Sequence, residues 1–316
     1  MFLINVFHHV ALITLLIITL IGEYSYVTSF CYGNNNNVLH PSFQQRFERT
    51  TTCPATTTDT FTDDDDTIEK KEVTTTIEVV LKMPDPLPNN LENEYYMLRH
   101  GQSTVNVAGI ISSARSLAYT KKHGLTPLGY QQGMDSAEQL VKLLTEEEKE
   151  IIFVSSPFAR AMETAQACLD GLRNNTSSNL KIDSNIRIEE DLMERYFGKL
   201  DGEVLSTYGY VWPVDMFNVM STVFGVESVA AVAARLRRAI LKLDREYEDS
   251  AIVLVSHADV LQICQLYGAN ADNVGLFSSY RFGNGEVRKM QRTPESLPEP
   301  KPLPPPTEMP LLNSEE

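Results

Sequence analysis

Cysteine and basic residues are scarce in this 316-residue chain, which has four Cys, and 27 Lys and Arg against 42 Asp and Glu. Four cysteines are too few for a small secreted fold held together by disulfides. The net charge of −15 argues against nucleic acid as the main partner, because that binding requires a basic surface that replaces phosphate counterions. The length and the hydrophobic fraction of 42% are typical of a chain with one or two globular domains.

Long hydrophobic runs are also few, and the strongest one lies at the N-terminus. Residues 1–22 contain no charged side chain, and Val10–Ile21 is almost entirely apolar. This run fits the hydrophobic region of a signal peptide better than a membrane span, which needs about 18–20 apolar residues. We therefore expect residues 1–29 to direct the chain into the secretory pathway, either as a cleaved signal peptide or as an uncleaved membrane anchor.

Apolar residues are sparse in residues 30–92, which contain clusters of Thr, the run Asn34–Asn37 and the run Asp63–Asp66. Such a segment buries too little apolar surface to offset its chain entropy, so we expect a disordered arm with at most one edge strand, at 73–82. The acid-poor stretch 30–58 is similar to a transit peptide, and together with the signal it resembles a two-part plastid address.

The C-terminal segment 291–316 carries half of the sixteen prolines. We expect a disordered, solvated tail. Its P-x-x-P spacing at Pro302–Pro306 is a candidate ligand for a proline-recognition domain.

The middle of the chain, residues 93–290, alternates strand and helix signals. Continuous apolar runs predict strands at Tyr95–Leu98, Ile151–Ser155 and Ala251–Ser256. Apolar residues at helical spacing predict helices over 129–144, 159–172, 228–247 and from His257 to Tyr267, and a last hairpin or edge strand is expected around 281–287. This order predicts an α/β fold: a three-layer α/β/α domain with a mostly parallel central sheet, flanked by the two disordered arms.

Each predicted strand ends in a polar cluster. Arg99-His100-Gly101 follows the first strand, Ser155–Arg160 the second, and Ser256–Asp259 the third. Ligands of open α/β sheets bind at the carboxyl ends of the strands, so two His and two Arg should surround one crevice. The planar fork of Arg suits a phosphate, and a His between two Arg can act as a nucleophile or as an acid and base.

The segment Leu98–Asn106, with the sequence LRHGQSTVN, resembles the signature of the histidine phosphatase superfamily, the phosphoglycerate mutase-like proteins. Further similar motifs follow in the order of that family over residues 93–290. They are Leu125-Thr126 with Gly129 and Gln132-Gly133, Ser155–Pro157 with Arg160, Leu192–Arg195 with Gly198 and Gly202, Glu227-Ser228, and Val255–His257.

The resemblance implies a role for six residues. His100 would be the nucleophile that becomes phosphohistidine, and Glu194 would protonate the leaving oxygen and then activate water. The phosphoryl oxygens would be held by Arg99, Arg160 and His257, and Asn106 would line the same pocket. No metal and no cofactor are expected, because two Arg and a His supply the positive charge that phosphoryl transfer needs.

Two positions depart from the family pattern. Ala258 stands where the family usually has Gly, and its methyl group is close enough in sequence to crowd the phosphate. Asp259 competes with Glu194 for the role of proton donor, because the acid-phosphatase branch has an Asp directly after the second His. The Glu194 motif matches and the Asp259 spacing does not, so we favour Glu194.

These residues predict a metal-independent phosphatase that hydrolyses a phosphate monoester, either a small molecule or a phosphoprotein. One alternative is a phosphoglycerate mutase, but the short connection Glu203–Val226 leaves no room for the long substrate-gripping insertion typical of those enzymes. A second alternative is a scaffold that binds phosphate without turnover. We expect Val107–Gly124 and Glu203–Val226 to determine the substrate, which the sequence does not name.

Overall fold

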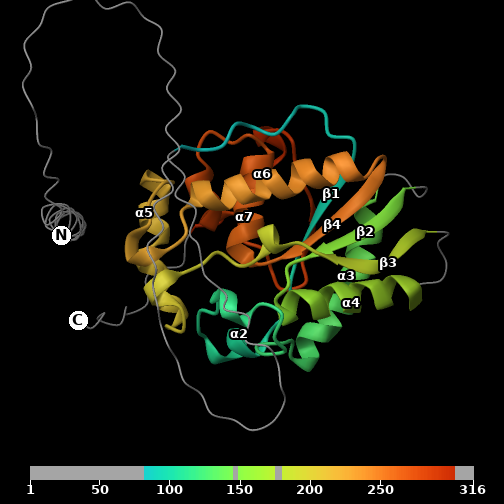
Figure 1. Ribbon diagram of the computed structural model, residues 1–316, viewed down its shortest axis with the longest axis horizontal. Helices are drawn as coiled ribbons and strands as arrows, with labels where there is room; N and C mark the ends of the chain where they lie inside the picture. The colour runs from blue at the N-terminus through green and yellow to red at the C-terminus, as the bar shows by residue number, and fades with distance from the viewer. Residues whose placement is uncertain (1–81, 145–148, 175–179, 303–316) are drawn as a thin grey trace, which may run out of the picture. The chain divides into compact units, whose positions relative to one another are not determined.

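The computed structural model describes residues 82–144, 149–174 and 180–302 (Figure 1). The predicted signal or anchor at 1–29, the low-complexity arm as far as residue 81 and the end of the Pro-rich tail lie outside these ranges, as does nearly all of the possible strand at 73–82. Within the described ranges, no helix is both long enough and apolar enough to cross a membrane.

A five-stranded sheet forms the centre of the domain. Its strands are β1 (Glu94–Arg99), β2 (Glu150–Ser155), β3 (Lys181–Ile188), β4 (Ser250–Ser256) and β5 (Val287–Lys289). They lie in the order β3-β2-β4-β1-β5, and every neighbouring pair is parallel except β1 and β5. The prediction of a mostly parallel sheet is therefore confirmed.

Helices cover both faces of this sheet, as Figure 1 shows. Alternate strand residues such as Met97 and Leu254 pack with α6 (Val229–Glu246) and α7 (Ala258–Gly268). Their neighbours Leu98 and Val255 face the other side, where α3 (Pro127–Leu143) and α4 (Ala159–Asn174) pack. Since both faces of the central strands are buried, these strands are apolar throughout, which is why they are easy to recognise in the sequence.

The helix boundaries follow local capping signals. Thr126 caps α3, its hydroxyl accepting from the Gly129 amide at 3.1 Å, and Pro127 occupies the first helical position, where its missing amide proton costs nothing. Ser228 caps α6 in the same way through the Ala231 amide. The apolar face predicted for α6 is confirmed, and Val232, Leu236 and Ile240 are fully buried.

One strand, β3, was not predicted. The sequence gives no continuous apolar run over β3, because β3 is an edge strand whose residues are all exposed or half-buried. Of the hairpin or edge strand expected around 281–287, the structure forms an edge strand slightly later in the chain: β5 pairs antiparallel with β1 and closes the other edge of the sheet.

The folded region extends beyond the predicted limits of 93–290. Leu87 is buried, and the Tyr267 hydroxyl donates to the Asp85 carbonyl at 2.5 Å. On the C-terminal side, the Arg292 guanidinium donates to the Pro88 carbonyl at 2.6 Å, and the Lys301 amide donates to the Ser279 carbonyl at 2.7 Å. The described parts of both flanking segments are thus held on the domain by backbone carbonyls and apolar contacts.

The two segments expected to determine the substrate pack against each other. Ile110 and Val204 form an isolated antiparallel bridge, and the Ile111 amide donates to the Glu203 carbonyl at 2.8 Å. A small separate core that includes Ile111 and Phe197 lies beneath them. Short elements make up this region: α2 (Thr104–Ala108), α5 (Trp212–Phe217), and the 3₁₀ turns η1 (Arg115–Leu117), η2 (Glu190–Leu192), η3 (Gly198–Leu200), η4 (Leu205–Tyr210) and η5 (Val223–Gly225). The remaining 3₁₀ turns are η6 (Val274–Ser279) and η7 (Pro294–Ser296).

Candidate active site

His100 lies immediately after β1 and is almost completely buried. Its Nδ1 is 2.7 Å from the Gly101 carbonyl oxygen. A carbonyl oxygen can only accept, so Nδ1 carries the proton and Nε2 keeps its lone pair. Burial, together with Arg160 and Arg99, holds the pKa of His100 well below its usual range. The imidazole is therefore neutral at physiological pH, with Nε2 available as a nucleophile.

Gly101 allows the chain to turn directly after this histidine. A Cβ atom at Gly101 would lie 2.2 Å from the Gly129 carbonyl oxygen, a distance at which atoms overlap. The Gly101 amide donates to the Thr164 hydroxyl at 2.9 Å. The backbone at the end of β1 therefore lies against the backbone at the start of α3 and against the Thr164 side chain of α4. These contacts fix the position of His100.

Arg160, from the first turn of α4, connects several parts of the site. Its Nε donates to His257 Nδ1 at 3.2 Å and its Nη2 donates to the Ser112 carbonyl at 2.9 Å. Its third nitrogen, Nη1, is buried and has no partner among the described residues. An unpartnered guanidinium nitrogen beside a neutral His is an available donor for an anion.

Arg99 has the same property. Its Nη1 donates to the Phe282 carbonyl at 2.6 Å, whereas its buried Nε has no partner within the described ranges. Burial lowers the pKa of both arginines, and Glu194 acts in the opposite direction on each. Both side chains remain cationic, because the Arg pKa starts far above neutral. Two buried positive charges with unused donors are costly unless an anion joins them.

His257 lies at the carboxyl end of β4 and is fully buried. Its Nδ1 accepts from Arg160, so its Nε2 carries the proton and donates to the Ser156 hydroxyl at 2.9 Å. Burial and Arg160 hold the pKa of His257 well below its usual range. The His257 and His100 rings lie edge to face with centroids 5.2 Å apart. The structure thus brings the two predicted histidines together.

Glu194 faces the same histidines from the loop after η2. Its Oε2 is 3.6 Å from His257 Nδ1 and 3.8 Å from Arg160 Nη2. Burial raises the pKa of Glu194 to about 7, with Arg160 acting against this rise and Asp259 adding to it. A carboxyl with such a pKa can both donate and accept a proton at neutral pH.

Asn106 uses its side-chain oxygen within the protein. That oxygen accepts from the Ser103 amide and the Ser103 hydroxyl, both at 3.0 Å, and from Asn284 Nδ2 at 3.4 Å. Asn284 also donates to the His100 carbonyl at 3.1 Å. The side-chain nitrogen of Asn106, Nδ2, is left without a partner among the residues described, which makes it a candidate donor. Asn284 connects Asn106 to His100, and no feature of the sequence singles it out.

Sequence reasoning also missed the ionic contacts that hold the Glu194 loop. Arg195 is fully buried, donates twice to Asp215 at 2.7 and 2.9 Å, and donates through Nε to the Glu227 carbonyl at 2.7 Å. Arg115 donates to the Glu194 carbonyl at 2.9 Å and to the Glu227 carboxylate at 3.2 Å. Each buried charge is paired, so the loop is held rigidly around Glu194. The adjacency of Arg195 to Glu194 was the one available signal in the sequence.

Asp259 lies close to the site but has other partners. Its Oδ2 accepts from Trp212 Nε1 at 3.2 Å and from Arg195 Nη1 at 3.4 Å. Burial raises the pKa of Asp259, and Arg195 opposes this rise. Ala258 is the first residue of α7, with helical backbone, so this position does not require glycine for its conformation.

The site has the chemistry of an anion pocket. Nitrogen and oxygen atoms of His100, Glu194 and His257 lie within 4.8 Å of one another, which is compatible with metal ligation. The two guanidinium groups at the same place repel a divalent cation and attract a phosphate.

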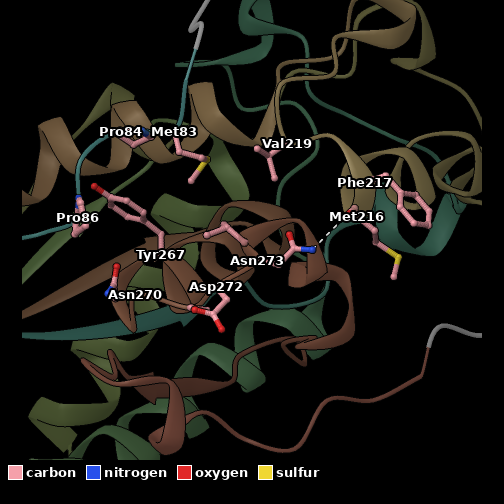
Figure 2. Close-up of a pocket in the computed structure, with 12 residues that line it drawn as sticks. Met83, Pro84, Pro86, Met216, Phe217, Val219, Tyr267, Asn270, Asp272 and Asn273 are labelled. Atoms are coloured by element: carbon pink, nitrogen blue, oxygen red, sulfur yellow. Dashed lines mark hydrogen bonds between the residues drawn. The ribbon is translucent and has the colours of Figure 1, made fainter.

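A separate cavity of about 500 Å³ lies away from these residues, between α5, the segment after α7 and residues 83–86 (Figure 2). Asn273 donates to the Met216 carbonyl at 3.0 Å on its wall. Its lining is polar and apolar in nearly equal parts, and none of the predicted site residues contributes to it.

Comparisons with known proteins find similar chains that are named as phosphatases. The curated adenosylcobalamin/alpha-ribazole phosphatase of Salmonella typhimurium is 28% identical over 176 residues, covering 53% of this chain and 75% of that protein. A solved structure of mycobacterial glucosyl-3-phosphoglycerate phosphatase has 21% identity and a TM-score of 0.48, covering 63% of this chain and 98% of that one. A mutant phosphoserine phosphatase of Entamoeba histolytica has 21% identity and a TM-score of 0.47, covering 62% and 88%. At such scores the two structural similarities carry no argument of their own.

The sequence model of the histidine phosphatase superfamily, branch 1, matches residues 95–297. This range includes β1 with its Arg99-His100-Gly101 end, the Glu194 loop and His257. The match covers well over half of the chain and contains every candidate site residue. The chain therefore belongs to the histidine phosphatase superfamily.

Proposed function

We propose that this protein hydrolyses a phosphate monoester through a phosphohistidine formed on His100, without a metal ion. The observation that carries the proposal is the state of His100. Its Nδ1 proton is held by the Gly101 carbonyl, and Arg99 and Arg160 both have unused buried donors beside it. A neutral nucleophile between two cations favours attack on a phosphoryl group whose oxygens are held by those cations.

The first step transfers the phosphoryl group to the enzyme. His100 Nε2 forms a bond to phosphorus, and the bond from phosphorus to the ester oxygen breaks. Glu194 gives its proton to that oxygen, so the organic product leaves as an alcohol. The pKa of Glu194, raised to about 7, keeps enough of the carboxyl protonated for this role.

The second step restores the enzyme. The Glu194 carboxylate takes a proton from water, whose oxygen attacks phosphorus while the bond to Nε2 breaks. Inorganic phosphate leaves, and His100 and Glu194 return to their starting protonation states. Arg99 and Arg160 hold the phosphoryl oxygens throughout both steps.

Hydrolysis is favoured over the two alternatives. A mutase must retain its substrate between the two transfers, whereas the connection from Glu203 to Val226 consists only of short turns and the six-residue α5. A binding scaffold needs no proton donor, whereas Glu194 lies 3.6 Å from His257 with a pKa matched to neutral pH.

The proposal is tested by trapping the intermediate. Turnover of a ³²P-labelled substrate, quenched without acid, should leave label on His100 in an acid-labile, base-stable bond. His100→Ala should lose both label and turnover, because the covalent route is removed. Label on Ser103 or Ser156, or normal turnover by the Ala variant, would contradict the mechanism.

A further inference from the structure

A stacked aromatic pair borders the catalytic residues. The Tyr208 ring, in η4, stacks on the Trp212 ring at the start of α5, with centroids 4.5 Å apart and planes 6° from parallel. The Phe197 ring packs edge to face against the Tyr208 ring, with centroids 4.9 Å apart. Phe197 follows Glu194 by three positions, so the pair lies beside the loop that carries the proton donor.

Buried polar contacts hold this pair in place. Trp212 Nε1 donates to Asp259 Oδ2 at 3.2 Å, and Asp259 is in the first turn of α7, directly after His257. Arg195 Nη1 approaches the same oxygen at 3.4 Å and is itself bound twice by Asp215. These contacts fix the Trp212 ring, and the Tyr208 ring packs between it and Phe197.

The Tyr208 hydroxyl is unused in this arrangement. It makes no hydrogen bond to any of the described residues, although the ring is half-buried. The charged groups that act on it most strongly are Asp259 and Glu194, followed by Arg99 and Arg160. Burial raises the pKa of Tyr208 well above its usual value, so the hydroxyl keeps its proton and is available as a donor.

We propose that the Tyr208 hydroxyl is a specificity-determining group that donates a hydrogen bond to an oxygen in the organic part of the substrate, on the side of the pocket where Glu194 protonates the leaving group. This inference rests on the proposed function, since the leaving-group side is defined by the role of Glu194. Asp259 and Trp212 then act as positioning residues for Tyr208.

This assignment names a class of substrate. An alkyl phosphate with a hydroxyl or carboxylate oxygen near the ester carbon would satisfy the Tyr208 donor. A substrate without that oxygen would leave the donor desolvated and unpaired, which costs binding free energy. Glycerol 1-phosphate and propyl phosphate form a matched pair, because they share the three-carbon chain and the ester and differ only in the two hydroxyls.

The test compares this pair of substrates in the full chain with Tyr208 and with Tyr208→Phe. We expect the wild type to prefer glycerol 1-phosphate, and the variant to lose about five- to tenfold in kcat/KM for it, while propyl phosphate changes by less than about twofold. Tyr130→Phe is the matched control, because the exposed Tyr130 of α3 donates its hydroxyl to Asp170 of α4, outside the candidate site, and its loss should affect neither substrate. Thermal unfolding of each variant checks that the fold is retained.

Three outcomes would overturn the inference. The first is an equal loss of kcat/KM for both substrates in Tyr208→Phe, and the second is no loss for either substrate. The third is a wild type with the same kcat/KM for glycerol 1-phosphate and propyl phosphate. Phosphohistidine trapping in the same wild-type preparation separates this failure from failure of the proposed function. Label on His100 with an unchanged Tyr208→Phe preference rejects only the inference, whereas a wild type without label rejects the mechanism itself.

Discussion

Two buried carboxyl groups, Glu194 and Asp259, lie near the second histidine, and their partners differ. Glu194 directs Oε2 toward His257 and Arg160 at 3.6 and 3.8 Å, while its Oε1 accepts from the Arg195 backbone amide at 3.0 Å. Asp259 accepts from the Trp212 indole and from Arg195. Desolvation raises the pKa of each, but only Glu194 has an oxygen directed to the place where a phosphoryl group would bind. This difference supports Glu194 as the acid.

Glu194 should therefore determine how the rate depends on pH and on the leaving group. With an alkyl phosphate, kcat/KM should fall as pH rises above about 7, because the proposed mechanism uses the protonated form of Glu194 as the acid. With p-nitrophenyl phosphate, whose leaving group is a stabilised phenolate, this alkaline decline should be weak. Any acidic limb due to His100 should lie well below pH 6.5, since its pKa is lowered. Rates measured from pH 4 to 9 check both expectations.

Variants assign this pH limb to one carboxyl. Glu194→Gln should slow the pre-steady-state burst with alkyl phosphates by about 10²–10⁴-fold and with the aryl substrate far less. Bursts are compared because Glu194 also activates water, which affects the steady state. Asp259→Asn should keep the ratio of propyl phosphate to aryl burst rates within about twofold, because propyl phosphate lacks the hydroxyls that Tyr208 would contact. A leaving-group dependence that follows Asp259 instead would place the chain with the acid-phosphatase branch in mechanism.

At the scale of secondary-structure elements, the decisive contact is between the exit of β1 and the start of α3. Gly101 and Gly129 approach so closely that a Cβ atom on either one would overlap backbone atoms of the other segment. The same approach lets the Thr126 hydroxyl cap α3 while the Thr126 amide donates to the Gln102 carbonyl at 2.9 Å. His100 is thereby held between a strand end and a capped helix, both of which are rigid.

Gly101→Ala should consequently reduce both stability and activity. The added methyl group would force backbone atoms apart, so we expect the free energy of unfolding to fall by about 1–3 kcal/mol. Gly283→Ala is a suitable control, because its Cβ would lie 3.4 Å from the flexible end of Glu286. Urea unfolding of the two variants provides the comparison, and equal stabilities would show that this contact is looser than the geometry indicates.

At the scale of the whole molecule, the sign of the charge in the site is opposite to that of the chain. The net charge is −15, whereas the pocket contains two guanidinium groups, each with one buried nitrogen that has no partner among the described residues. Pairing of Arg195, Arg115 and Arg235 with Asp215 and Glu227 neutralises the surrounding charges, so Arg99 and Arg160 remain the candidate ligands of a phosphate. The positive charge that many phosphatases obtain from a metal ion can therefore come from these two side chains.

Activity should accordingly survive removal of divalent cations. Dialysis against excess EDTA should change kcat/KM for a phosphate monoester by less than about twofold, because Arg99 and Arg160 already supply the positive charge. Adding Mg²⁺, Mn²⁺ or Zn²⁺ back in separate assays provides the control. A rate that collapses with EDTA and returns with one of these ions would mean that His100, Glu194 and His257 act as metal ligands.

Local patterns in the sequence were sufficient to predict the main elements and to nominate the six candidate site residues. Apolar runs identified β1, β2 and β4 because both faces of these strands are buried, and the 3.6-residue period identified α6 because one side of it faces the sheet. Polar residues directly after each of these strands indicated the site, because parallel strands bring their carboxyl ends to the same edge. The family motifs then singled out His100 as the candidate nucleophile.

Contacts between distant segments decided the rest, and no local pattern encodes them. The edge strand β3 gains its pairing only from β2, and Leu87 is buried only because the domain offers a surface for it. The side-chain partners of Arg195 lie 20 and 64 positions away. The unused donors of Arg99 and Arg160, the raised pKa of Glu194 and the free hydroxyl of Tyr208 all depend on burial. Residue types and order therefore indicated which groups could react, whereas tertiary packing determined their protonation and their open hydrogen bonds, because both depend on which atoms exclude water.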